Sequence, residues 1–116
     1  MGNTKGGNIG EFEELVLLVV GTLNDNAYGV EVRNFIIQET GRKVNISAVH
    51  EVLKRLEKKK FIRSEVGGAT EERGGRRKKF FFLTTEGKQA LDYSRELRNG
   101  LYNRIPEVGF NFSGLV

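Results

Sequence analysis

The residues with the clearest chemical potential are four consecutive cations at positions 76–79, which follow a glycine pair and precede three phenylalanines. Like charges placed side by side repel one another, so an anionic partner would stabilise this run. The wider segment 54–79 holds 11 Lys and Arg against 4 Asp and Glu, although the whole chain carries a formal net charge of only +4. Charge gathered in this way favours a polyanionic partner such as nucleic acid, and a hydrated lysine-rich surface is the alternative.

Catalytic and metal chemistry have few residues to use. The 116-residue chain contains no cysteine and a single histidine, His50. These counts exclude disulfides, thiolate nucleophiles and cysteine-ligated zinc, and they leave almost nothing for a histidine-based catalytic triad. We therefore expect a protein without enzyme activity, metal or cofactor.

The sequence favours a soluble, cytoplasmic protein with no membrane partner. The longest apolar run, residues 15–20, is far too short to cross a bilayer. The N-terminal segment 1–10 is rich in Gly and Asn and lacks the apolar core of a signal peptide, so we expect a disordered arm there. The length of the chain predicts a single domain.

Residues 11–23 are predicted to form a helix that is apolar on most of its sides. Glu11, Glu13 and Glu14 fall in its first turn, where the helix dipole favours anions. The β-branched valines that follow leave a strand as the competing interpretation. A helix with so much apolar surface must be covered on most sides, which in a small domain indicates a second subunit. The predicted dimer-interface positions in this segment are Phe12, Leu15, Val16 and Val19.

Two further helices are predicted over residues 27–40 and 44–61. Gly41 is placed to end the first, and Asn45 is a favourable N-cap for the second. The second is clearly amphipathic, because its apolar residues recur at intervals of three and four. That stripe consists of Ile46, Val49, Leu53 and Leu56, with Val52 beside it.

A β-hairpin is predicted next, with strands at 61–66 and 76–84 joined by a polar, glycine-rich tip. Side chains alternate between the two faces of a strand, so one face of the second strand belongs to the core. We expect the core pair to be Phe81 and Leu83, and the less buried pair to be Phe80 and Phe82.

The last predicted helix covers residues 84–105, with Thr85 as its cap and Pro106 at its end. Its apolar side carries Leu91, Leu97 and Leu101.

This order of elements predicts a mainly α fold with a small β-hairpin, an α+β winged helix-turn-helix. In such a fold the second helix of the pair enters the major groove of DNA and the hairpin reaches the neighbouring backbone. The predicted division is an arm at 1–10, a DNA-binding domain at 11–84, a C-terminal helix at 85–105 and a tail at 106–116.

The predicted DNA-binding residues follow from this arrangement. On the recognition helix, side chains that can meet base edges or phosphates are Ser47, Ala48, His50 and Lys54. The cations of the hairpin are Arg73, Arg76, Arg77, Lys78 and Lys79, with Tyr28 as a further phosphate donor. The alternatives are a hydrated hairpin end, a half-packed His50 ring and a packed Tyr28 ring. Arg55 lies nearer the packed side and is a candidate for an ion pair inside the domain.

Three segments, 27–32, 46–65 and 74–91, resemble the PadR family of bacterial transcriptional regulators. The most specific parts are Leu-Lys-Arg-Leu-Glu at 53–57 and the glycine, basic and aromatic run at 75–84. The resemblance implies a homodimeric, repressor-type protein that binds double-stranded DNA at a palindromic operator. It also implies N-terminal and C-terminal dimerisation helices, with the helix at 85–105 pairing with the partner's first helix through Leu91, Leu97 and Leu101. A small, often aromatic, effector is expected to regulate binding.

The chain departs from the family pattern in places. It has no tryptophan, and a single predicted helix follows the wing, as in the short-tailed members. His50 and Glu51 replace a common Tyr-Pro pair, and Phe82 stands where a polar residue is usual. Packing is one interpretation of Phe80 and Phe82, and the wall of an effector pocket is the other. A winged-helix protein-interaction module that does not read DNA is the alternative function.

Overall fold

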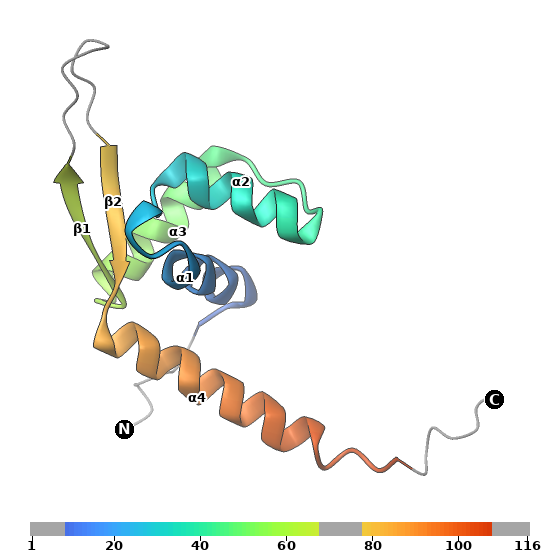
Figure 1. Ribbon diagram of the computed structural model, residues 1–116. Coiled ribbons are helices and arrows are strands. Elements are labelled where there is room, and N and C mark those ends of the chain that lie inside the picture. The colour runs from blue at the N-terminus through green and yellow to red at the C-terminus, as the bar shows by residue number, and fades with distance from the viewer. Residues whose placement is uncertain (1–8, 68–77, 108–116) are drawn as a thin grey trace.

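The computed structural model describes residues 9–67 and 78–107. In these residues four α-helices and a two-stranded sheet follow the predicted order, which confirms the α+β winged-helix architecture (Figure 1). Their bounds are α1 Glu11–Leu23, α2 Gly29–Thr40, α3 Ile46–Lys58, β1 Ile62–Gly67, β2 Lys78–Leu83 and α4 Thr85–Tyr102, with a single 3-10 turn, η2, at Asn24–Asn26.

The core lies where α1, α2 and α3 pack together beside β2. Most of the predicted stripe of α3 is buried there, with Val49, Leu53 and Leu56 almost inaccessible to solvent, whereas Ile46 at the start of the helix is half-buried. The segment 11–23 is a helix rather than a strand. Val16 and Val19 of that helix lie in the protomer's own core, at 0% and 5% exposure. These two side chains are covered without a second subunit. The prediction that they belong to a dimer interface is therefore withdrawn.

The helix ends follow local backbone chemistry. Gly41 ends α2 in the left-handed conformation at a φ of 74°, and the side chain of Asn45 caps α3 by accepting from the Ala48 amide at 2.9 Å. Both features are as predicted. The cap of α4 is Thr84 and not Thr85, because the Thr84 hydroxyl accepts from the Gly87 amide at 3.0 Å.

The sheet is an antiparallel hairpin in which Ile62 pairs with Leu83 and Gly67 with Lys78. The free edge of β2 also meets the start of α2, since the Phe81 amide donates to the Ala27 carbonyl at 2.8 Å. Phe81 is buried and Leu83 packs against the core, while Phe80 and Phe82 are half-buried on the other face. The predicted alternation is confirmed.

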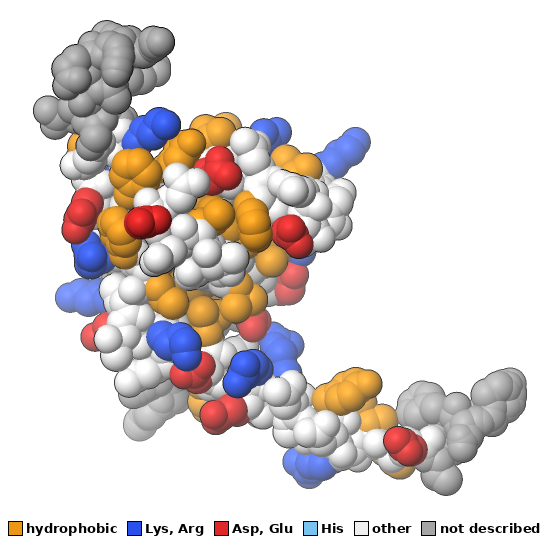
Figure 2. All heavy atoms as spheres, in the orientation of Figure 1, with side chains coloured by type: hydrophobic (Ala, Val, Ile, Leu, Met, Phe, Trp, Pro, Cys, Tyr) orange, Lys and Arg blue, Asp and Glu red, His pale blue; other side chains and the backbone are white. Residues whose placement is uncertain are grey.

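Helix α4 begins against the body and then extends away from it (Figure 1). Its first part is buried through Gly87, Ala90 and Leu91, whereas Leu97 and Leu101 are 51% and 54% exposed. Leu91 belongs to the protomer's own core and, like Val16 and Val19, is covered without a second subunit. The helix ends at Tyr102, three residues before the predicted end at 105. Apolar side chains are visible on its outer part (Figure 2). Within the described residues, no helix is long and apolar enough to cross a bilayer.

Candidate nucleic-acid interface

An open groove of about 610 Å³ lies between the start of α2, the exposed face of α3 and the beginning of β2. We call it the α2–α3–β2 groove. Besides apolar residues and Glu57, the groove is lined by five of the residues predicted to bind DNA, namely Tyr28, His50, Lys54, Lys78 and Lys79. Segments 50 residues apart in sequence therefore contribute to one surface, as a winged-helix interface requires.

The first half of α3 presents short polar side chains to solvent. Ser47 and His50 are exposed and Ala48 is half-buried, while the neighbouring apolar residues face the core. The first turn of α3 carries no acidic residue, so nothing there offsets the positive end of the helix dipole. Glu51 is exposed as well, which places one carboxylate among these side chains. This face can donate hydrogen bonds to base edges from Ser47 and His50.

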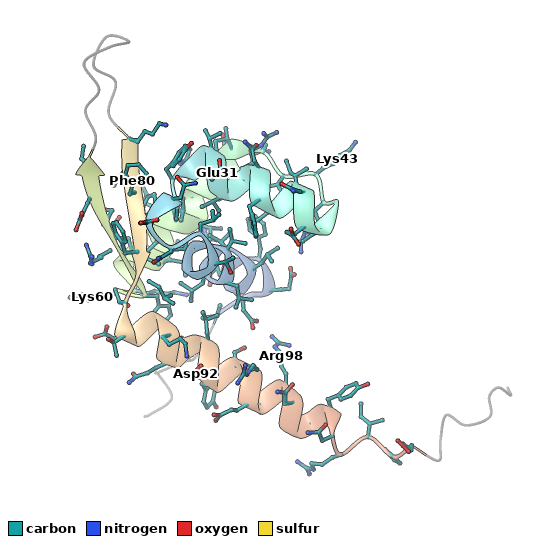
Figure 3. All side chains as sticks on the ribbon, in the orientation of Figure 1. Glu31, Lys43, Lys60, Phe80, Asp92 and Arg98 are labelled. Atoms are coloured by element: carbon teal, nitrogen blue, oxygen red, sulfur yellow. The ribbon has the colours of Figure 1, made fainter. Side chains whose placement is uncertain are left out.

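Tyr28 is held between the wing and the helix pair. Its ring packs edge-to-face on Phe80, with the two centroids 5.5 Å apart, and Lys78 Nζ lies 4.3 Å from its centroid. Phe80 lies on β2 beside the start of α2 (Figure 3). Because Tyr28 directly precedes α2 and bridges to Phe80 through the backbone, the ring is oriented by both elements. Tyr28 is thus a packed aromatic that also lines the groove.

His50 lies directly over Gly29. A Cβ atom at position 29 would come within 2.5 Å of the His50 Cε1 atom, so only glycine lets the ring approach this closely. Gly29 therefore permits the close approach of α2 and α3 at this point. The contact restrains His50 at the junction of α2 and α3 while leaving the residue exposed.

The two described cations of the wing have different partners. Lys79 Nζ lies 3.9 Å from Glu57 Oε1, and the other carboxylate oxygen of Glu57 accepts from the Ser64 hydroxyl at 2.6 Å. Lys78 instead lies over the Tyr28 ring. Glu57 therefore offsets part of the positive charge at one end of the groove, a role the sequence analysis did not assign. Arg73, Arg76 and Arg77 lie outside the described residues.

The outer face of the hairpin explains the aromatic residue at position 82. The guanidinium of Arg63 lies 4.5 Å from the centroid of the Phe82 ring, and the two residues are cross-strand partners. A cation over an aromatic face is attracted by the ring quadrupole. Phe80 likewise has Tyr28 as its partner. Neither phenylalanine lines the α2–α3–β2 groove, and their assignment to an effector pocket stays a prediction.

Arg55 does not face the groove. Its Nε donates to a carboxylate oxygen of Glu13 at 2.8 Å, which confirms the predicted ion pair inside the domain. Burial acts to raise the pKa of Glu13, but hydrogen bonds from Arg55, Lys59 and the Gly10 amide outweigh it and lower the pKa. The described residues contain no group of three or more potential metal ligands.

Comparisons with known proteins agree on one family. The model of the transcriptional regulator PadR-like family matches residues 16–93. A PadR family transcription regulator from hypervirulent Clostridium difficile R20291 is similar in structure, with a TM-score of 0.66 and 26% identity, over 81% of this chain and 93% of that one. No curated protein matches the chain.

Two further solved structures share the fold at lower identity. A PadR-like transcriptional regulator from Bacillus cereus strain ATCC 14579 has a TM-score of 0.68 and 17% identity, over 87% of this chain and 93% of that one. The Bacillus subtilis PadR in complex with operator DNA has a TM-score of 0.62 and 21% identity, over 72% of this chain and 46% of that one. With the family model covering more than half of its length, this chain belongs to the PadR-like family of transcriptional regulators.

Proposed function

We propose that this protein is a sequence-specific, DNA-binding transcriptional regulator that binds a palindromic operator as a homodimer. The observation that carries the proposal is the convergence of Tyr28, His50, Lys54 and Lys78 from three elements on the α2–α3–β2 groove. The fold likeness to a PadR structure that contains operator DNA supports it.

In this proposal α3 enters the major groove with its first turns toward the bases. Ser47 and His50 hydrogen-bond base edges, and the Ala48 methyl group meets a thymine methyl. Lys54 and Lys78 lie at the side of this face and contact phosphates, which fixes the position of the helix along the duplex. The proposed phosphate contacts of the wing also include Lys79, Arg73, Arg76 and Arg77.

The exposed apolar side of α4 supports the homodimer. Tyr93, Leu97 and Leu101 recur at every fourth position and are each more than half exposed, on a part of the helix that extends from the body. Leaving this surface in water is unfavourable, and a second copy of the chain would cover it. On α1, Leu18 is 46% exposed, and Phe12 and Leu15 are half-buried. A two-fold dimer then predicts an operator with two-fold symmetry.

The repressor role and the release from DNA by a small, aromatic effector belong to the same proposal and rest on the family. The hollow of about 330 Å³ between α1 and α4 supports a place for the effector near the dimer interface. It is lined by Leu18 and Leu91 together with Glu14 of α1 and with charged residues of α4, both cations and Asp92. A phenolic compound would find apolar and cationic groups there.

Selection of bound sequences from a random pool of duplex DNA tests the proposal. The expected result is enrichment of an inverted repeat whose half-sites lie about one helical turn apart. A band-shift assay over a salt series then measures the affinity for the selected sequence and for a scrambled one. Absence of any enriched sequence would contradict the proposal and favour a winged-helix module that binds another protein.

A further inference from the structure

The first turn of α1 carries three carboxylates, and each one pairs with a different part of the fold. Glu11 pairs with Arg42 in the loop that precedes α3, through two contacts of 2.8 and 3.2 Å. Glu13 pairs with α3 and Glu14 with α4. Three residues of one helix turn thus contact the segments at both ends of the proposed DNA-binding helix and the helix proposed for dimerisation.

Glu11 contacts the loop before α3, and Glu13 contacts cations at the end of α3. Arg42 lies three residues before the N-cap of α3, whereas Arg55 belongs to its last turn and Lys59 is its C-cap. Glu13 receives Arg55 Nε at 2.8 Å and Lys59 Nζ at 3.1 Å, and its own side chain is only 12% exposed. Because water has little access to this carboxylate, the two cations are its principal partners, and a shift of Glu13 must move them with it.

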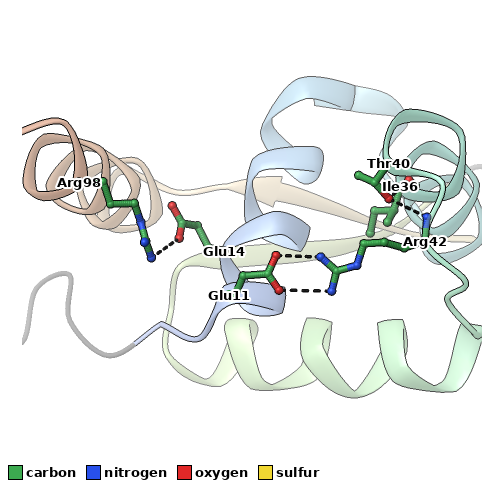
Figure 4. A network of polar contacts seen from close by, with 6 residues as sticks. All are labelled: Glu11, Glu14, Ile36, Thr40, Arg42 and Arg98. Atoms are coloured by element: carbon green, nitrogen blue, oxygen red, sulfur yellow. Dashed lines mark hydrogen bonds and ion pairs between the residues drawn. The ribbon is translucent and has the colours of Figure 1, made fainter. Parts of the chain in front are cut away.

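Glu14 joins the same turn to α4. Its carboxylate accepts from the Ser94 hydroxyl at 3.1 Å and from Arg98 at 3.2 Å, with the Glu14 side chain 16% exposed. Figure 4 shows Arg42 and Arg98 on opposite sides of α1, each pointing to its own carboxylate. Among the described elements, α4 packs chiefly on α1. The start of α4 is fixed on β2 and Phe61, so a change in the position of the helix beyond this start reaches the rest of the protomer through α1.

We propose that the first turn of α1 is a joint that transmits the position of α4 to α3, with Glu13 and Glu14 as positioning residues. The inference rests on the proposed function in that α3 is taken as the DNA-reading helix. When α4 moves, the Glu14 carboxylate moves with it, and the neighbouring Glu13 is displaced as part of the same helix turn. Arg55 and Lys59, which pair with Glu13, then transmit the displacement to α3. A second subunit or a ligand that changes the position of α4 on α1 thereby changes the angle at which α3 meets DNA.

Charge reversal at Arg98 tests the joint, because Arg98→Glu removes the pair with Glu14 and adds repulsion. Lys88→Glu is the matched control, since it makes the same change of charge on the same helix at the same 63% side-chain exposure and the Lys88 partner is Asp92 within α4. The double variant Glu14→Arg with Arg98→Glu restores an opposite-charge pair. Each variant is measured for hydrogen exchange of the α3 amides without DNA, for dimerisation, and for affinity to the selected and a scrambled duplex.

The expected result is that Arg98→Glu speeds exchange in α3 and lowers the affinity for the selected sequence by about threefold or more relative to the scrambled one. The charge-swapped variant recovers both properties, and Lys88→Glu leaves both as in the wild type. Equal effects of Arg98→Glu and Lys88→Glu, or no recovery in the swapped variant, would overturn the joint. A wild-type protein that selects no DNA sequence would refute the proposed function alone, since the exchange measurement still decides the joint.

Discussion

Replacing Lys54 and Lys78 together with alanine should reduce the number of phosphates that the protein neutralises. The two lysines line the α2–α3–β2 groove from different elements, and both are exposed. Each lost phosphate contact lowers the slope of log K against log salt by about 0.9, so the pair should lower it by roughly 1.8. Between 50 and 200 mM salt, a fourfold change, the wild type should then lose about twelvefold more affinity than the double variant.

The assay is fluorescence anisotropy on a labelled duplex at several salt concentrations, with thermal unfolding as a check on the fold. The matched control is Lys88→Ala with Arg95→Ala, which also removes two exposed cations but from α4, a helix that contributes nothing to the groove. We expect the control to keep the wild-type slope. Equal slopes for the wild type and the Lys54/Lys78 variant would refute the assignment of the groove to DNA.

Three further predictions follow from single contacts. Gly29→Ala places a methyl group against His50, so the ring must move; we expect weaker DNA binding with the melting temperature nearly unchanged, and an equal binding affinity would refute the contact's role. Gly87→Ala places its Cβ 2.1 Å from the backbone carbonyl oxygen of Phe61, so chemical denaturation should show a loss of about 1–3 kcal/mol, and full stability would contradict the packing. The lowered pKa of Glu13 means that its stabilisation is present above the ordinary value of 4.5 and is lost as pH falls below it; Glu13→Gln should flatten this acid-side decline in unfolding free energy, and an unchanged decline would count against the ion pair.

Much of the fold could be predicted because its signals are local. The apolar stripe of α3 follows helical spacing. Glycine, the residue at position 41, adopts the left-handed conformation without steric cost, and Asn45 has the side chain that an N-cap requires. The alternation around Phe81 likewise determined which face of the hairpin is buried. Each of these features depends on residues that are close together in the sequence.

The dimer-interface positions on α1 could not be separated from the core by the same means. A helix that is apolar on most sides needs cover, but the sequence does not say whether its own domain or a second subunit supplies it. The structure shows that α2 and α3 are large enough to bury Val16 and Val19. The cap of α4 was missed by one residue because Thr84 and Thr85 are equivalent in type, and only the end of β2 decides between them.

The candidate site could be predicted in part, because some of its residues belong to elements with local sequence signals. His50, Lys54 and Lys78 follow from their places on predicted elements, and the structure brings them together. The role of Glu13 could not be found, because its partners Arg55 and Lys59 lie more than 40 residues away in sequence. Acidic residues in a first helical turn are common, and their tertiary partners appear only once the helices are packed.

Repeating the random-DNA selection with the double variant Ser47→Ala and His50→Ala tests the central claim most directly, namely that α3 reads bases. We predict that the wild type enriches an inverted repeat. The variant should lose its preference at one or two positions in each half-site, while the slope of log K against log salt stays the same. If the variant enriches the wild-type sequence with equal strength, α3 does not read the bases through these residues and the account is contradicted.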